Sequence, residues 1–284
     1  MTIDKLPDIK IKGVNGSHVL VATFSNVSQV IKADPGSMIY KRGHVDKPET
    51  EKGTSWTNMF KRAFAGQSMF MSTFRGLPES SKMNGILALS SDIPADIIEI
   101  SIPVGKELRI SRGSFLACSE NVTMEAALIK KGFIPWGQDE GGILPVLKVQ
   151  EGSGPGKVWL SSFGMFEKHD LVAKEEMTID NGVFLAVDND VKYEIVKIGK
   201  TILGSLLTGE GFGMKFVGPC TIYTQSKNFD DFSHVITNNK SVSVSRGPTD
   251  NNIHVSMGGK RILKKTTKPR SVVKKAKTNK PPDK

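Results

Sequence analysis

A strand-turn-strand pattern occurs three times in this chain and decides the fold that the sequence predicts. Residues 31–39 read IKADPGSMI, residues 108–116 read LRISRGSFL, and residues 177–185 read MTIDNGVFL. Each copy places one glycine after turn-forming residues and then continues at once into an apolar run. The glycines expected in these structural turns are Gly36, Gly113 and Gly182. The recurrence is an architectural signal and carries no chemistry of its own.

The segments around the pattern recur in the same order and predict three related β units. The glycines are separated by 113 − 36 = 77 and 182 − 113 = 69 residues, which suits a repeated small β domain and not a solenoid. A unit of this size rarely buries a sufficient core alone, so we expect the three to pack on each other. We place the units at residues 9–102, 103–172 and 173–227.

Each unit is expected to contain at most one short helix. Residues 56–64 carry apolar side chains at the i, i+3, i+4, i+7 and i+8 spacing of an amphipathic helix, and residues 202–207 repeat part of that spacing. The corresponding segment of the second unit, residues 126–137, contains Pro135, which argues against a full helix there.

The net charge of +10 lies entirely in the last 25 residues. Residues 260–284 hold eleven Lys or Arg and one acid, so 11 − 1 = +10, and the remaining 28 basic and 28 acidic residues cancel. The Lys/Pro/Thr composition of this tail cannot assemble a core, which predicts disorder. Before it, residues 228–259 can form a hairpin or a linker. The candidate nucleic-acid contacts are Lys260, Arg261, Lys264, Lys265, Lys268, Arg270, Lys274, Lys275, Lys277 and Lys280.

The cysteines and the N-terminus predict a soluble protein in a reducing compartment. Cys118 and Cys220 form neither a disulfide framework nor a metal-binding spacing. Residues 1–8 contain no apolar signal core, and their two Asp argue against a transit peptide. No run reaches the roughly twenty apolar residues that a membrane helix needs. We expect a cytoplasmic location, with the nucleus as the alternative because of the basic tail.

Six segments follow one another in a specific order along the chain: DPGSMIY at 34–40, RAFAGQSMF at 62–70, RGSFLA at 112–117, VWLSSFG at 158–164, DNG at 180–182 and TGEG at 208–211. With these segments assembled, the chain resembles the Altered Inheritance of Mitochondria family (protein 24). The resemblance covers about residues 10–227 and implies a compact all-β structure. The implied architecture is three repeated β-sandwich domains similar to the tryptophan RNA-binding attenuator protein, around a pseudo-threefold axis. The family implies no established catalytic activity and offers no active site to carry over.

Residue patterns that could support catalysis or metal binding are weak. The glycines at 209, 211 and 213 follow a helix and open a strand, the reverse of a phosphate-binding loop. Five scattered histidines show no metal-ligand spacing, and residues 188–190 lack the later glycine and glutamate of a calcium loop. His169 and Asp170 are adjacent in a strand, so they point to opposite faces. The aromatic residues that we assign to the core are Phe115, Trp159, Phe163, Phe184 and Phe212. We therefore expect no catalytic residues, no cofactor and no metal.

Three functional hypotheses follow from the sequence. The leading one is a non-enzymatic scaffold or interaction protein, because glycines and apolar positions recur while no acid, base or nucleophile set does. The first alternative is non-specific binding of nucleic acid or an acidic partner by the Lys-rich tail. The second alternative is a small-ligand or enzymatic site at the junction of the three units, where pockets tend to form. A homo-oligomer is compatible with each hypothesis.

Overall fold

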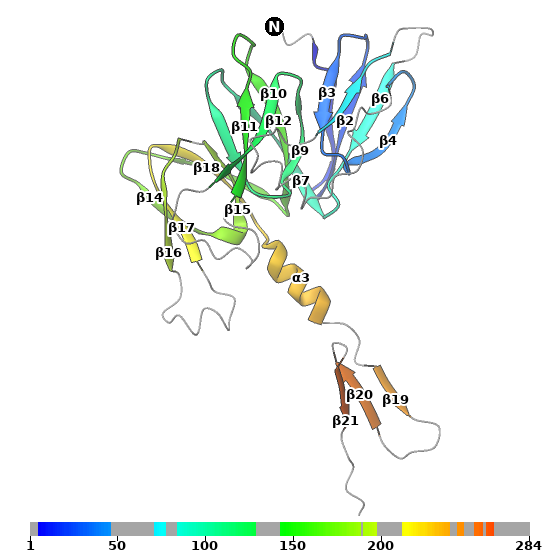
Figure 1. Ribbon diagram of the computed structural model, residues 1–284, viewed down its shortest axis with the longest axis vertical. Helices are drawn as coiled ribbons and strands as arrows, with labels where there is room; N and C mark the ends of the chain where they lie inside the picture. The colour runs from blue at the N-terminus through cyan, green and yellow to red at the C-terminus, as the bar shows by residue number, and fades with distance from the viewer. Residues whose placement is uncertain are drawn as a thin grey trace, which may run out of the picture. The chain divides into compact units, whose positions relative to one another are not determined.

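The protein is built almost entirely of antiparallel β-strands (Figure 1). The computed structural model describes residues 5–46, 71–77, 84–128, 143–188, 190–197, 212–238, 243–246, 253–257 and 260–263. The strands before the helix are β1 (Asp8–Val14), β2 (Ser17–Phe24), β3 (Val30–Ala33), β4 (Met38–Arg42), β5 (Ser72–Arg75), β6 (Gly85–Leu89), β7 (Ala95–Ile102), β8 (Glu107–Ile110), β9 (Phe115–Ser119), β10 (Val122–Leu128), β11 (Ile143–Val149), β12 (Gly156–Phe163), β13 (Phe166–Leu171), β14 (Glu176–Asp180), β15 (Phe184–Asp188), β16 (Tyr193–Lys197), β17 (Phe212–Val217) and β18 (Cys220–Gln225).

One compact unit spans residues 1–230, and a second begins at Asp231. The first unit contains four sheets. Their strand orders are β1-β2-β6-β4, β5-β3-β9-β12-β7, β10-β11-β8-β15-β18-β13 and β14-β17-β16. The all-β class expected from the sequence is confirmed.

One pairing scheme occurs three times along the chain. In the first strand set (β2 to β6), β6 pairs with both β2 and β4, and β3 pairs with β5. In the second set (β7 to β12), β12 pairs with both β7 and β9, and β8 pairs with β11. In the third set (β13 to β18), β18 pairs with both β13 and β15, and β14 pairs with β17. This scheme groups β7 with the second strand set and β13 with the third, whereas the sequence placed residues 95–102 in the first unit and residues 166–171 in the second.

Three hydrophobic cores lie between the sheets, one at each strand set, and each core also contains side chains from a neighbouring set. The first core contains Leu20, Phe74 and Trp159. The second lies around Ile110 and Leu160, and the third is centred on Phe184 and Phe216, whose rings stack with centroids 6.4 Å apart. Because the two longer sheets each combine strands of two sets, neighbouring cores share a sheet. Burial of these apolar side chains is the main stabilising term of the fold.

The three motif glycines all lie between the second and third strands of their sets. Gly36 follows β3, Gly113 follows β8, and Gly182 follows β14 within a single 3₁₀ turn, residues Asn181–Val183. Their backbone conformations differ, since Gly113 has a φ of 73° while the other two lie outside the left-handed region. Only Gly113 therefore depends on the conformational freedom of glycine.

The chain continues through a helix into a small sheet. Helix α3 spans Phe229–Asn238, and strands β19 (Ser243–Arg246), β20 (Ile253–Met257) and β21 (Lys260–Leu263) form an antiparallel sheet in that order. Within 228–259 the sequence offered a hairpin or a linker, and the structure has a helix followed by a hairpin there. Residues 260–263, expected in the disordered tail, form a strand because β21 pairs with β20.

Two expected helices, at residues 56–64 and 202–207, lie outside the described residues. In the third candidate segment, Ala126–Leu128 belong to strand β10, as the doubt about a helix at Pro135 indicated, and Pro135 itself is not described. Among the described residues, no helix is long and apolar enough to cross a membrane.

Candidate functional site

A cavity of about 500 Å³ lies where the three strand sets meet. The first set contributes the Asp34 turn and the second contributes the Gly113 turn with Phe163. The third set contributes Gln225 at the end of β18, and Phe229 at the start of α3 also reaches the cavity. Phe229 packs edge-on against Phe163, with ring centroids 6.0 Å apart. This is the junction at which the sequence placed its alternative ligand site.

Gln225 joins the second and third sets at this cavity. Its Oε1 accepts a 2.9 Å hydrogen bond from the backbone N–H of Phe163, and its Nε2 donates to the carbonyl of Gly182 over 3.2 Å. No local sequence pattern indicates this role, because the partners of Gln225 lie 62 and 43 residues away in the chain. The amide therefore holds a motif turn of one set against a strand end of another.

The polar groups of the junction cavity mostly stabilise its turns. The Asp34 carboxylate accepts from the N–H of Gly36 at 3.1 Å, and the Ser37 hydroxyl donates to the Asp34 carbonyl at 2.8 Å. In the second set the Ser114 hydroxyl donates to the Ser111 carbonyl, also at 2.8 Å. Burial raises the pKa of Asp34, against the lowering effect of its hydrogen bond to Gly36. A half-buried carboxyl beside hydroxyl groups and the Arg112 side chain can bind a small polar molecule, and the described lining contains no histidine, cysteine or lysine.

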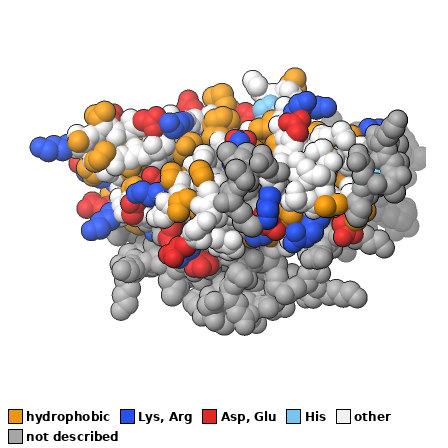
Figure 2. Space-filling view, turned by 90° about the horizontal axis from the view of Figure 1, so that it is seen from above, with side chains coloured by type: hydrophobic (Ala, Val, Ile, Leu, Met, Phe, Trp, Pro, Cys, Tyr) orange, Lys and Arg blue, Asp and Glu red, His pale blue; other side chains and the backbone are white. Residues whose placement is uncertain are grey.

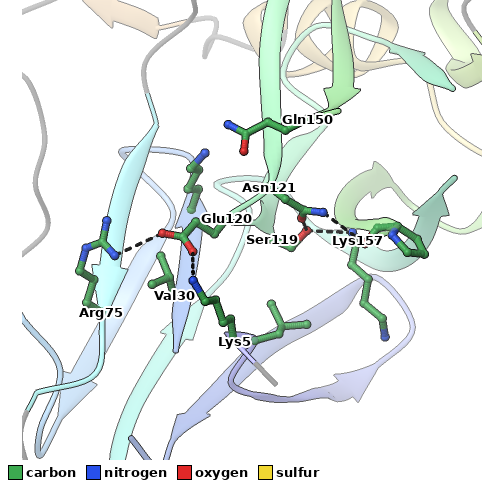
Figure 3. Close-up of a pocket in the computed structure, with 11 residues that line it drawn as sticks. Lys5, Val30, Arg75, Ser119, Glu120, Asn121, Gln150 and Lys157 are labelled. Carbon is green, nitrogen blue, oxygen red and sulfur yellow. Dashed lines mark hydrogen bonds and ion pairs between the residues drawn. The ribbon is translucent and has the colours of Figure 1, made fainter. Parts of the chain in front are cut away.

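A second cavity of about 410 Å³ lies at the seam between the first and second sets (Figure 3). Glu120 lies at its centre, 3.3 Å from the Arg75 guanidinium and 4.0 Å from the Lys5 ammonium. Two further lysines line the wall and are engaged elsewhere. Lys32 donates to the Val122 carbonyl at 3.0 Å, and Lys157 pairs with Glu99 at 2.6 Å.

Asn121 fixes the loops on the far side of the second cavity. Its Oδ1 accepts from the Ser119 hydroxyl at 2.6 Å, and its Nδ2 donates to the Gly154 carbonyl at 2.7 Å. The same Ser119 hydroxyl accepts from the backbone N–H of Lys157 at 3.0 Å. These contacts tie the β9–β10 turn to the β11–β12 loop. In the same cavity, the Glu120 carboxylate already pairs with the cations of Arg75 and Lys5.

The described surface shows no concentration of one charge sign on the face seen from above. In Figure 2, Lys and Arg side chains are interspersed with Asp and Glu among hydrophobic ones. This distribution agrees with the formal neutrality of residues 1–259, where 28 basic and 28 acidic residues cancel. Broad electrostatic attraction of nucleic acid by this face is therefore not supported.

His169 and Asp170 make separate contacts and form no dyad. The His169 imidazole lies 2.9 Å from the Thr224 hydroxyl, while Asp170 accepts from Thr221 at 2.7 Å and pairs with Lys168 at 2.8 Å. The Lys168 and Thr221 hydrogen bonds hold the pKa of Asp170 below its usual value. Opposite strand faces explain the separation, as the sequence predicted.

The remaining sequence candidates have structural roles where they are described. Asp190 pairs with Lys106 at 3.0 Å, and no group of three or more potential metal ligands occurs among the described residues. Cys118 and Cys220 are both free, with Cys118 buried and Cys220 half-buried. Of the aromatic residues assigned to the core, Phe115, Trp159, Phe163 and Phe184 are buried. The side chain of Phe212 and the glycines at 209 and 211 lie outside the described residues.

The tail candidates are only partly described. Lys260 and Arg261 belong to strand β21. The others, Lys264 to Lys280, lie outside the described residues, so their role stays a prediction.

The fold and the cavities define an all-β protein with shared sheets and no recognisable catalytic set among the described residues. The chain belongs to the family described as mitochondrial biogenesis AIM24, whose model matches residues 10–227. This confirms the resemblance found in the sequence.

Two relatives from Streptococcus pyogenes show how far the likeness extends. An uncharacterized protein of serotype M6 is 31% identical over 171 residues, covering 60% of this chain and 63% of its own length. The chain therefore matches less than two thirds of that relative. The X-ray crystal structure of protein SPYM3_0169 superposes with a TM-score of 0.61, covering 81% of this chain and 97% of that one at 24% identity. The likeness to that structure concerns the fold alone.

Proposed function

We propose that this protein is a non-enzymatic scaffold built of three equivalent β units, as in the attenuator-protein architecture that its family resemblance implies. The observation that carries the proposal is the way strands are shared between sets. β3 of the first set pairs with β9 of the second, and β8 of the second pairs with β15 of the third. Residues at these seams pack or bond to backbone, which supports a structural role.

A ligand screen by thermal shift tests the scaffold proposal against its enzymatic or ligand-binding alternative. A scaffold should show no large, saturable shift of the melting temperature with metal ions, nucleotides or small metabolites. A saturable shift would overturn the proposal, since a ligand that binds only the folded state stabilises it. The same screen on a Gln225→Ala variant, with Gln150→Ala at the second cavity as the matched control, would locate such a ligand.

The junction cavity supports small-ligand binding as the second candidate function. Its volume of about 500 Å³ lies in the range of ordinary ligand pockets. Hydroxyl groups, the Asp34 carboxyl and the Arg112 guanidinium in its lining would favour a small polar molecule that carries both hydrogen-bond donors and acceptors. The Gln225→Ala variant should then weaken the shift, whereas Gln150→Ala should leave it unchanged.

Nucleic-acid or acidic-partner association through the tail is a separate candidate, supported by charge alone. Truncation after Leu263 tests it and retains β21, whose pairing with β20 a cut at Gly259 would destroy. The removed segment contains nine Lys or Arg and one Asp, so 9 − 1 = +8. If the tail binds DNA or RNA by neutralising phosphates, the truncated protein should lose most binding and most salt dependence. Equal binding by both proteins would place recognition in the β core.

A further inference from the structure

Two strand pairings join neighbouring sets, and we call each of these pairings a seam. Both seams follow the same rule. The second strand of a set pairs with the third strand of the next set, as in β3 with β9 and β8 with β15. The registers agree, because Ala33 faces Ala117 in the first seam and Ile110 faces Ala186 in the second. Each seam is extended by a backbone hydrogen bond from the motif turn. Asp34 N–H donates to the Leu116 carbonyl at 2.9 Å, and Ser111 N–H donates to the Leu185 carbonyl at 2.8 Å.

Among the described residues, one second strand and one third strand have no partner of this kind from another set. β14, the second strand of the third set, lies at the edge of its sheet, and β4, the third strand of the first set, lies at the edge of another. Among the described residues, no strand pairs with the outer edge of either. Unpaired strand edges carry rows of free N–H and C=O groups and readily pair with another chain.

The apolar side chains of β4 are exposed where their counterparts are covered. Met38, Ile39 and Tyr40 are 41%, 53% and 48% exposed. The residues at the same distance from the motif glycine in the other sets are at most 8% exposed. Those buried counterparts are Phe115, Leu116 and Ala117 in β9, and Phe184, Leu185 and Ala186 in β15. β9 is flanked by β3 and β15 is flanked by β8, whereas no described strand lies beside the outer edge of β4. We attribute the greater exposure of the β4 side chains to this missing strand.

Transfer of the seam register aligns β14 with β4 residue by residue. Ile179 would face Tyr40, Thr178 would face Lys41, and the Asp180 N–H would donate to the Ile39 carbonyl. The charges allow this alignment, because Lys41 would face Thr178 and Arg42 would face Met177, while the acidic residues stand at the two ends of β14. No like charges would stand directly opposite each other, an arrangement that destabilises paired strands.

We propose that β14 of one molecule pairs with β4 of a second copy of this chain, forming a head-to-tail interface that repeats the internal seams. The two edges lie on opposite sides of the 1–230 unit in Figure 1, so one molecule does not bring its own edges together. A head-to-tail interface leaves a free edge at each end of a dimer and generates a closed ring or an open fibre. The proposal rests on the equivalence of the three units, and its test needs no ligand.

A proline in β14 blocks the interface while sparing the sheet that β14 already belongs to. In the internal seams the N–H groups of Asp34 and Ser111 point to the neighbouring set. Asp180 is their counterpart, so the N–H of Thr178, two residues earlier, also points away from β17. Proline removes this N–H and is tolerated on edge strands. Thr178→Val, which keeps the N–H, is the matched control.

Light scattering after size exclusion measures the assembly. The wild type and Thr178→Val should give masses that are multiples of 30.9 kDa, and Thr178→Pro should give 30.9 kDa with an unchanged far-UV circular dichroism spectrum. Tyr40→Glu, at an exposed position of β4, should also give the monomer and serves if Thr178→Pro fails to fold. A monomeric wild type, or a folded Tyr40→Glu variant that assembles like the wild type, would overturn the proposal.

Cysteine cross-linking then identifies the pair of strands and the number of chains. Lys41→Cys and Thr178→Cys are made separately in a Cys220→Ser background, where the remaining Cys118 is buried. Strand partners lie about 4.5–5.5 Å apart between Cα atoms, within reach of a disulfide. Mild oxidation of the two mixed variants should give a covalent dimer, and neither variant alone should. If the double variant forms its disulfide within a single monomeric chain, β14 closes on its own β4, and the second-copy proposal is wrong.

Discussion

Shortening Leu116 and Ile39 to alanine tests how much a seam strand adds to the stability of the strand beside it. Leu116 and Ile39 both lie three residues after a motif glycine, yet Leu116 is 1% exposed and Ile39 is 53% exposed. Leu116→Ala removes buried methyl groups and leaves a cavity in the first core, which typically costs about 2–5 kcal/mol of unfolding free energy. Ile39 has only 100 − 53 = 47% of its surface covered. Since full burial of such a side chain contributes about 1.5–3 kcal/mol, Ile39→Ala should cost about 1 kcal/mol or less.

Urea unfolding followed by tryptophan fluorescence gives both losses. The measurement is made at a protein concentration where light scattering reports the monomer, so that a second copy does not cover Ile39. Leu185→Ala, at the fully buried position of the third set, provides the replicate and should match Leu116→Ala. Equal losses for Ile39→Ala and Leu116→Ala in the monomer would refute the claim that β4 lacks a covering strand.

Three further predictions follow from local geometry. Gly113→Ala should destabilise the protein by about 1 kcal/mol in thermal unfolding because the φ of Gly113 is 73°, whereas Gly36→Ala should be neutral or slightly stabilising, since an added Cβ meets only an ordinary contact at 3.5 Å. Burial raises the pKa of Asp34, so ionisation of this carboxyl opposes folding. Asp34→Asn should therefore stabilise the protein at pH 7 relative to the wild type, and the difference in unfolding free energy should shrink as the pH falls through the raised pKa towards 3.8. A stability advantage of Asp34→Asn that grows on acidification would contradict this sign. Burial raises the pKa of the Cys118 thiol to about 12, so in the native protein at pH 8 a thiol reagent should modify Cys220 first and Cys118 only on unfolding; mass spectrometry of the labelled peptides decides the order.

The sequence predicted the strands well because their signals are local. Apolar residues on either side of a glycine turn marked the segments 31–39, 108–116 and 177–185, where the structure has β3 and β4, β8 and β9, and β14 and β15. The family was identified from motif order, which also depends on short segments. The core assignment of Trp159 was confirmed by its complete burial, and its ring N–H donates to Glu99 at 3.1 Å.

What the sequence did not predict depends on contacts between distant segments. Helix α3 carries Phe229, Phe232 and Ile236 at helical spacing, but the surrounding polar residues suggested a hairpin or linker. No local signal groups β7 with the second strand set or β13 with the third, because these strands pair with β12 and β18, about sixty and fifty residues later in the chain. Gln225 and Asn121, which organise the two cavities, are single polar residues whose partners no local pattern specifies.

Shared sheets also determine when the chain can complete its structure during synthesis. The outer edge of β3 can pair with β9 only after residues up to Ser119 have been synthesised, and the outer edge of β8 can pair with β15 only after residues up to Asp188. A nascent chain released one set at a time therefore exposes an edge strand until the following set has emerged from the ribosome. Proteins that fold domain by domain avoid this delay. For this chain we expect translation arrest between residues 120 and 180 to leave an aggregation-prone intermediate that would require chaperone protection.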